Sequence, residues 1–212
     1  MIFRELLVFL VLTVGATQAS AAEAKRVLMI VNEGFYAPEY YHPRQVFDRQ
    51  GFKVTVAAKE ARLVRPDKRN ADYQPVRAEL AFDKVDLTRY DAITFAGGNG
   101  AWTDYFPNEA AHRILKEAFK RDMITGLICS STGLLAVAGN FDGQQKSLVE
   151  GRHVTGYYRV EGLLRNIGKA NYDAGEKDKP YVVTDGNLIT GRDPISSQLF
   201  GEAVAKKVLG AN

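Results

Sequence analysis

The chain has 212 residues, of which 46% are hydrophobic and 25% charged, and its net charge is +3. This length allows one domain with a sizeable core, and the composition is that of a soluble globular protein. Because no run of five like charges occurs, the sequence gives no reason to expect nucleic acid or anionic lipid as a partner. A proline and an aspartate interrupt the one basic cluster, which we interpret as a solvated loop in preference to a phosphate-binding patch; its members are Arg62, Arg65, Lys68 and Arg69.

Residues 1–22 have the layout of a secretory signal peptide. A short polar start with Arg4 precedes an apolar run over 6–16, and small residues follow at 19–21. The apolar run is shorter than the roughly 20 residues that a membrane span needs. We therefore expect an exported protein, periplasmic or secreted, with no membrane attachment once the signal is removed. Because Glu5 offsets the charge of Arg4, an uncleaved anchor is the alternative.

Beyond the signal, apolar runs alternate with helical patterns, and residues 25–212 are expected to form a single domain. Strands are predicted at 26–31, 52–58, 91–96 and 123–128, and helices at 38–51, 107–122, 132–139 and 195–210. Residues 62–87 are irregular, with short extended pieces expected in PVRAELAFDKV (75–85). Residues 181–190 are predicted to form a hairpin around Asp185-Gly186. Strands that alternate with helices indicate an α/β protein with a mostly parallel sheet covered on both faces.

The only cysteine, Cys129, stands in the stretch GLICSSTGLL, between the strand at 123–128 and the helix that follows it. In parallel sheets, ligands bind at the carboxyl ends of the strands, where Cys129 lies. A glycine turn at 97–100 follows the carboxyl end of a second predicted strand. A sharp strand-to-helix turn lifts its central side chain clear of the sheet, and small neighbours leave the backbone room. The start of the following helix favours the reactive thiolate, and its amides, with one from the glycine turn, can hold an oxyanion.

The residues alone leave three interpretations of this thiol open. Export favours disulfides, yet Cys129 has no partner in its own chain. It is therefore buried and inert, paired between molecules, or kept free for chemistry. Free cysteine is often a small buried hydrophobic residue, but the small neighbours and the strand-end position favour chemistry.

Five segments together resemble the DJ-1/PfpI superfamily. They are KRVLMIVNEGFYAPEYYHP, YDAITFAGGNGA, ITGLICSSTGLLAVAG, LVEGRHVTGYY and YVVTDGNLITGRDP. Their order and spacing cover nearly all of the chain after the signal. The resemblance implies a flavodoxin-like, doubly wound α/β fold with a C-terminal hairpin, related to class I glutamine amidotransferases. It also implies a homodimer.

The resemblance assigns catalytic roles to four residues. Cys129 occupies the position of the reactive cysteine, and Glu39 matches a glutamate that hydrogen-bonds the sulfur. A carboxyl group desolvated beside a thiolate has a raised pKa, and its proton favours the thiolate by hydrogen bonding. Gly98 matches the glycine on the oxyanion side, with the backbone of Ser130 as the companion donor.

Three further residues are expected to contact a small-molecule substrate. Arg192 matches an arginine near the family's pocket and is expected to attract an anionic group of the substrate. Asn99 belongs to the glycine turn. Tyr157 occupies a position at which some members carry a histidine.

Histidine is where the chain departs from the family pattern. Many family hydrolases place one directly after the cysteine, where this chain has Ser130. The chain has only three histidines, and we interpret all of them as surface or packing residues: His42, His112 and His153. His42 can share a helical face with Glu39, but two residues without a third ligand make no metal site. We expect neither a metal nor another cofactor.

Three functions are consistent with these features. The first is a cysteine enzyme for a small carbonyl or amide substrate, glyoxalase-like or amidase-like, in which the missing histidine argues against peptide bonds. The second is a redox-sensing or stress-protective protein in which Cys129 is oxidised without turnover. The third is an inert descendant of the fold that binds a ligand or a partner.

Overall fold

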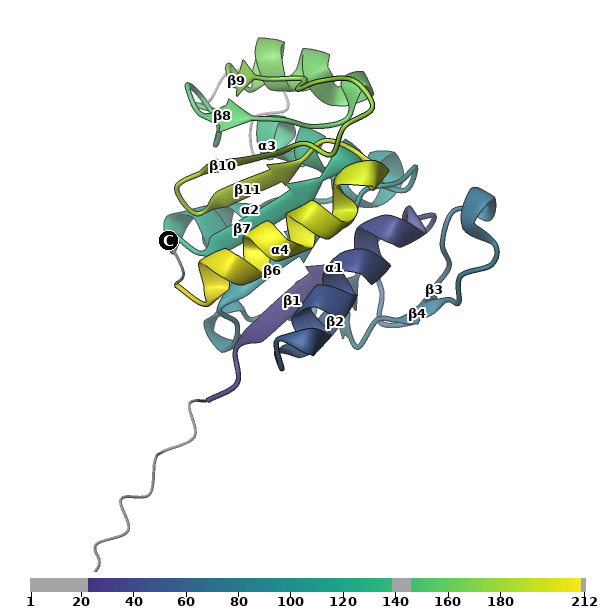
Figure 1. Cartoon of the computed structure of the whole chain (residues 1–212). Coiled ribbons are helices and arrows are strands. Elements are labelled where there is room, and N and C mark those ends of the chain that lie inside the picture. Colours follow the sequence, from purple (N-terminus) through teal and green to yellow (C-terminus); the bar gives the residue numbers. More distant parts are fainter. Residues whose placement is uncertain (1–22, 139–145, 211–212) are drawn as a thin grey trace, which may run out of the picture.

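The computed structural model describes residues 23–138 and 146–210, so the predicted signal peptide at 1–22 lies outside the described residues. The main strands are β1 (Arg26–Ile30), β2 (Lys53–Ala58), β5 (Leu80–Ala81), β6 (Ala92–Phe95), β7 (Ile124–Ile128), β10 (Val182–Asp185) and β11 (Leu188–Gly191). They form a seven-stranded sheet in the order β10-β11-β7-β6-β1-β2-β5 (Figure 1). In this sheet β10 runs antiparallel to β11, and all the other neighbours are parallel.

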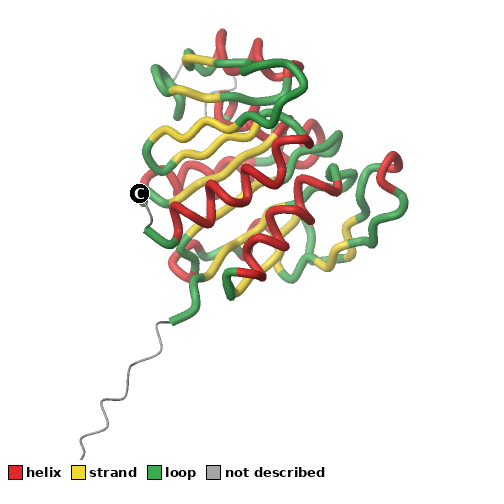
Figure 2. The backbone as a smooth tube through the Cα atoms, in the orientation of Figure 1, coloured by secondary structure: helices red, strands yellow, loops and turns green. Residues whose placement is uncertain are grey.

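Helices cover both faces of the sheet. The helices α1 (Ala37–Arg49) and α4 (Ser197–Val208) pack on one face, with α2 (Glu109–Lys120) and α3 (Leu134–Val137) on the other (Figures 1 and 2). The central strand β1 contributes Val27 and Met29 to one core cluster and Leu28 and Ile30 to the other. Since both faces of the strand are covered, its sequence is apolar at successive positions.

The α/β, flavodoxin-like class predicted from the sequence is confirmed, as are the positions of the main strands. The segment predicted as a helix at 132–139 is shorter than expected. A 3-10 turn over Cys129–Gly133 leads into α3, which has only four residues, and residue 139 lies outside the described part. The short extended pieces expected at 75–85 are β4 (Val76–Arg77) and β5. The otherwise irregular stretch also contains β3 (Leu63–Val64), which pairs antiparallel with β4.

A second small sheet pairs β8 (His153–Val154) with β9 (Asn171–Tyr172) in parallel. It is joined to the C-terminal hairpin, because the amide of His153 donates to the Asp185 carboxylate at 2.8 Å. Among the described residues, no helix is long and apolar enough to cross a membrane.

Candidate active site

Cys129 lies on a strained turn at the end of β7. Its φ is +60°, in the left-handed region that residues other than glycine rarely adopt. Such a conformation costs roughly 1–3 kcal/mol and persists where the surroundings enforce it. The backbone therefore has the sharp strand-to-helix turn that the small residues of the sequence predicted.

Hydrogen bonds to the neighbouring hydroxyls hold this turn. The Ser131 hydroxyl accepts from the amide of Ile128 at 3.0 Å and lies within donating distance of the carbonyls of Phe95 and Ile128. The carbonyl of Cys129 itself accepts from the Thr132 hydroxyl at 2.7 Å and from the Tyr157 amide at 3.3 Å. The strain is thus offset by a buried polar network that ties the turn to the adjacent strand β6.

Glu39 reaches the cysteine from the first turn of α1. Its side chain is fully buried, and Oε2 accepts the Gly97 amide at 2.8 Å. A Cβ atom placed on Gly97 would lie 2.6 Å from Glu39 Oε2 and 2.9 Å from Cys129 Cβ, so carboxyl group, thiol and glycine turn meet at one point. Position 97 must be glycine for the other two groups to approach each other.

Burial dominates the protonation of this pair. It raises the pKa of Glu39 to about 8, although interactions with Cys129 and the Gly97 amide oppose the rise. Burial also raises the pKa of the Cys129 thiol well above its ordinary value, and the Glu39 carboxyl group adds to the rise. The amide and hydroxyl of Ser130 act in the opposite direction. Burial therefore favours the protonated form of both groups at neutral pH, in contrast to the thiolate expected from the sequence.

The oxyanion side of the site differs from the expectation. Ser130 Oγ accepts from the Gly98 amide at 2.9 Å and donates to the Gly98 carbonyl at 2.8 Å. Gly98 has a φ of +109°, which suits the close approach of the turn to Phe35. The amide predicted as an oxyanion donor is thus already used by the Ser130 side chain, and a substrate oxygen would have to displace that hydroxyl.

A cavity of about 260 Å³ opens above the thiol. The structure brings four predicted site residues to its wall in addition to Ser130 and Gly98: Cys129, Glu39, Asn99 and Tyr157, which come from four separate segments. Its other lining residues are Tyr36, Arg69, Trp102, Arg159 and Pro194. Cys129 lines this cavity although only 6% of the residue is exposed.

Six of the seven predicted site residues therefore line one cavity, and the seventh, Arg192, does not. Its guanidinium group donates to the carbonyls of Ala174, Glu176 and Lys179 and pairs with Asp193 at 2.8 Å. With its donors engaged in this way, Arg192 fastens the 174–179 loop to the end of β11. Arg192 therefore does not line the Cys129 cavity, and its contact with substrate stays a prediction.

Sequence reasoning missed two basic residues of the cavity wall. Arg69 belongs to the cluster interpreted as a solvated loop; in the structure Arg62 and Arg65 do pair with Glu33, but Arg69 lines the cavity. Arg159 follows the Tyr157 position and was not singled out. Neither shows a local pattern that would identify it, because exposed arginines in loops are common.

No histidine reaches the thiol. All three histidines of the chain are in the described part, and none of them lines the cavity. His153 is exposed, and His112 has its Nε2 2.7 Å from the Phe106 carbonyl. Within residues 23–138 and 146–210, no group of three or more metal-ligating side chains is placed to hold a metal ion.

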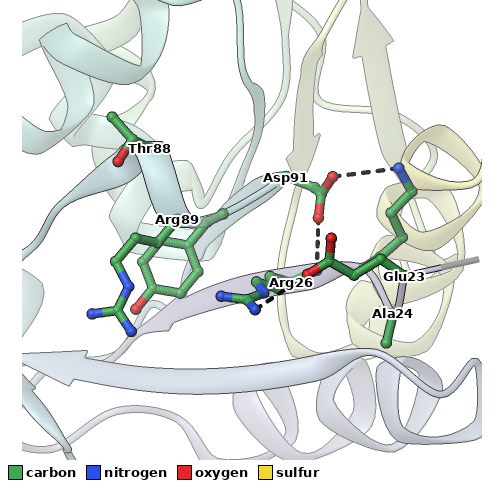
Figure 3. Close-up of a pocket in the computed structure, with 8 residues that line it drawn as sticks. Glu23, Ala24, Arg26, Thr88, Arg89 and Asp91 are labelled. Carbon is green, nitrogen blue, oxygen red and sulfur yellow. Dashed lines mark hydrogen bonds and ion pairs between the residues drawn. The ribbon is translucent and has the colours of Figure 1, made fainter.

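A larger cavity, of about 460 Å³, lies at the amino ends of β1 and β6, away from the carboxyl ends where Cys129 lies (Figure 3). Both of its acidic side chains are paired, Asp91 with Lys25 and Glu23 with Arg26, each at 3.3 Å. No cysteine, serine or histidine stands among its lining residues. The cysteine of the chain and the buried carboxyl group of Glu39 meet at the other cavity, above Cys129.

The site defines the class of the protein. It is an α/β protein with a cysteine on a strained strand-to-helix turn, beside a buried carboxyl group. Residues 25–207 match the DJ-1/PfpI family, and the chain belongs to that family. This agrees with the resemblance found in the sequence.

Individual relatives match over most of their length. The chain is 28% identical over 169 residues to a deglycase of Thermococcus kodakarensis, a match that covers 80% of this chain and 90% of the relative. It is 25% identical over 187 residues to the dj-1beta protein of Drosophila melanogaster, covering 88% and 91%. The crystal structure of a ThiJ/PfpI domain protein from Brachyspira murdochii matches with a TM-score of 0.74 at 24% identity, over 89% of this chain and 97% of that one.

Proposed function

We propose that the protein is a cysteine-dependent enzyme that acts on small carbonyl compounds, with 2-oxoaldehydes as the substrate class. The observation that carries this proposal is the meeting of Cys129 with a protonated Glu39 at the base of a small cavity that no histidine lines. The name deglycase, carried by the Thermococcus kodakarensis relative, agrees with carbonyl chemistry.

The buried carboxyl group can supply the proton transfers that addition to an aldehyde requires. The sulfur forms a bond to the aldehyde carbon, and the carbonyl π pair moves to oxygen. Glu39 gives its proton to that oxygen and takes the thiol proton, so the hemithioacetal forms with no net change in protons. A pKa of about 8 suits this exchange, because it lies near the working pH.

The same carboxyl group can complete the reaction of a 2-oxoaldehyde. Removal of the proton at C1 and delivery of a proton to C2 converts the hemithioacetal into a thioester of a 2-hydroxy acid. Water then cleaves the thioester and releases the acid and the free thiol, so the net reaction consumes one water. No amine leaves, which is why the absence of a histidine weighs less here than in an amidase.

The decisive experiment measures conversion of methylglyoxal to lactate by the purified protein. We expect turnover that is lost in Cys129→Ala and in Glu39→Gln. His42→Gln is the matched control, because His42 lies on the same helix as Glu39 but does not line the cavity, and it should keep wild-type activity. Absence of turnover together with a gain of two oxygens on Cys129 after mild peroxide would favour the redox-sensing alternative.

We also propose that residues 1–22 direct export and are then removed. The apolar run and the small residues that follow it support this proposal. Mass spectrometry of the protein from fractionated cells tests it, because cleavage places the new N-terminus near residue 22. The full-length mass in a membrane fraction would instead indicate an uncleaved anchor.

A further inference from the structure

The wall of the Cys129 cavity is unevenly charged. Arg69 and Arg159 are its two basic side chains, and Glu39 is the one acidic side chain among the lining residues. Because Glu39 is protonated at neutral pH, the lining residues together carry positive charge. The two guanidinium groups come from the 3-10 turns Lys68–Asn70 and Tyr158–Val160, which are far apart in the sequence and both contribute to this cavity.

Arg69 is held in place by a partner that leaves one side of it available. Its Nε and Nη2 donate to the two oxygens of Asp67 at 2.8 and 3.1 Å. Asp67 also accepts from the side-chain amide of Asn99 at 2.8 Å, and the Arg69 guanidinium lies 5.4 Å from the centre of the Tyr36 ring. Among the described residues, Nη1 of Arg69 has no hydrogen-bond partner, so this group remains free to bind an anion.

Arg159 has no acidic partner among the described residues. Its Nε donates to the Tyr158 hydroxyl at 3.2 Å, and the guanidinium lies 5.8 Å from the centre of the Tyr158 ring. The charge of Arg69 is close enough to Arg159 to disfavour its protonated form, against the stabilising effect of Tyr158. The Asp67 carboxylate compensates the charge of Arg69, whereas no described carboxylate compensates the charge of Arg159, so the two guanidinium groups together favour an anionic ligand. Guanidinium donors also match a carboxylate well.

We propose that Arg69 and Arg159 select substrates that carry a carboxylate, so that the natural substrate class is the anionic 2-oxoaldehydes. This inference rests on the proposed function for the reaction and on the cavity wall for the charge. A volume of about 260 Å³ lies just below the roughly 300 Å³ at which pockets for larger ligands begin, so the substrate is a small molecule. The aldehyde reaches Cys129 while the carboxylate is held by the arginines.

The first test compares two 2-oxoaldehydes of equal carbon number, 4,5-dioxopentanoate and the uncharged 2-oxopentanal. Wild type is expected to have the higher kcat/KM on the anionic compound. Arg159→Gln and Arg69→Gln should each lower that value by about tenfold, the effect of one lost charge-assisted hydrogen bond, mainly through KM. Arg159→Lys keeps the charge and should recover part of the loss. Equal kcat/KM values for the two compounds in wild type and in both glutamine variants would overturn the proposal.

A second test needs no turnover. Iodoacetate and iodoacetamide differ mainly in charge, and Cys129 is the only thiol that either can alkylate. The ratio of their alkylation rates reports the charge near the sulfur, while changes in thiol ionisation cancel. We expect the ratio of the iodoacetate rate to the iodoacetamide rate to fall by about threefold or more in Arg159→Gln. The effect is smaller than the tenfold above because solvent ions screen an exposed charge.

Arg89→Gln is the control for net charge, because Arg89 lines the other cavity, at the amino ends of β1 and β6 (Figure 3). It should leave the alkylation ratio as in wild type. If no 2-oxoaldehyde is converted but the ratio falls only in the cavity variants, the proposed reaction fails and the preference for an anion stands. If the ratio is the same in wild type, Arg69→Gln, Arg159→Gln and Arg89→Gln, the arginines do not select charge and the inference is wrong.

Discussion

Replacing Glu39 by glutamine should stabilise the protein, and by more as the pH rises. The side chain is fully buried, and its pKa is raised from the ordinary 4.5 to about 8. Glutamine has nearly the same shape, cannot ionise and can still accept the Gly97 amide hydrogen bond that Glu39 Oε2 accepts at 2.8 Å. The variant therefore removes the cost of keeping an acid protonated while preserving the packing.

The sign and size of the effect follow from linkage between protonation and folding. Below pH 4.5 the carboxyl group is protonated in both the folded and unfolded states, and wild type loses nothing. Between pH 4.5 and 8 the unfolded chain releases the proton and the folded chain keeps it, so the stability of wild type falls as pH rises. At 1.36 kcal/mol for each pH unit, wild type should be less stable than Glu39→Gln by about 1 kcal/mol at pH 5, about 3 at pH 7 and about 5 at pH 9.

Urea unfolding at these three pH values measures the difference. With a slope of roughly 2–3 kcal/mol per molar urea, the midpoint of the variant should exceed that of wild type by about 1 M or slightly more at pH 7. Glu60→Gln makes the same exchange on an exposed side chain and controls for the substitution itself. Equal midpoints for wild type and Glu39→Gln at pH 9 would refute the reasoning, since they would mean that burial does not hold the Glu39 proton.

Three other substitutions test individual contacts. Ser130→Ala removes both hydrogen bonds to Gly98 and should destabilise the protein by about 1–2 kcal/mol in urea unfolding. It should also slow alkylation of the thiol by iodoacetamide, because the Ser130 hydroxyl lowers the thiol pKa. Unchanged alkylation would contradict that role. Arg192→Gln should make the 174–179 loop more sensitive to trypsin while leaving KM for methylglyoxal unchanged, whereas a raised KM would support the substrate role predicted from the sequence. Gly97→Ala places a methyl group 2.6 Å from the buried carboxylate oxygen and should abolish turnover even where circular dichroism shows a folded protein; full activity would show that the carboxyl group and the sulfur need not meet.

The sequence predicted those features whose signals are local. The apolar run of β1 is read from successive residues, and the turn at Cys129 from the small residues around it. Both depend on contacts within a few positions of the chain. The fold class follows in turn, because the order of strands and helices limits the topologies that can form.

Features that depend on where a side chain points were predicted less well. Arg192 was expected to lie near the pocket, but its guanidinium group binds the carbonyls of a loop more than ten residues away. Arg69 and Arg159 were missed because folding alone brings their two turns together. The protonation of Cys129 was expected from the following helix, and the depth of burial, which only the structure gives, reverses it.

The left-handed backbone at Cys129 makes the protein's reactivity more fragile than its fold. The turn stays closed only while the hydroxyls of Ser131 and Thr132 keep their partners, whereas the sheet beneath is held by packing on both of its faces. A fluctuation that opens this short stretch lets the backbone relax to an ordinary conformation and turns the sulfur away from its acid. On warming, we expect the protein to lose the reactivity of Cys129 before the sheet unfolds, because the turn opens at a lower free energy than the core.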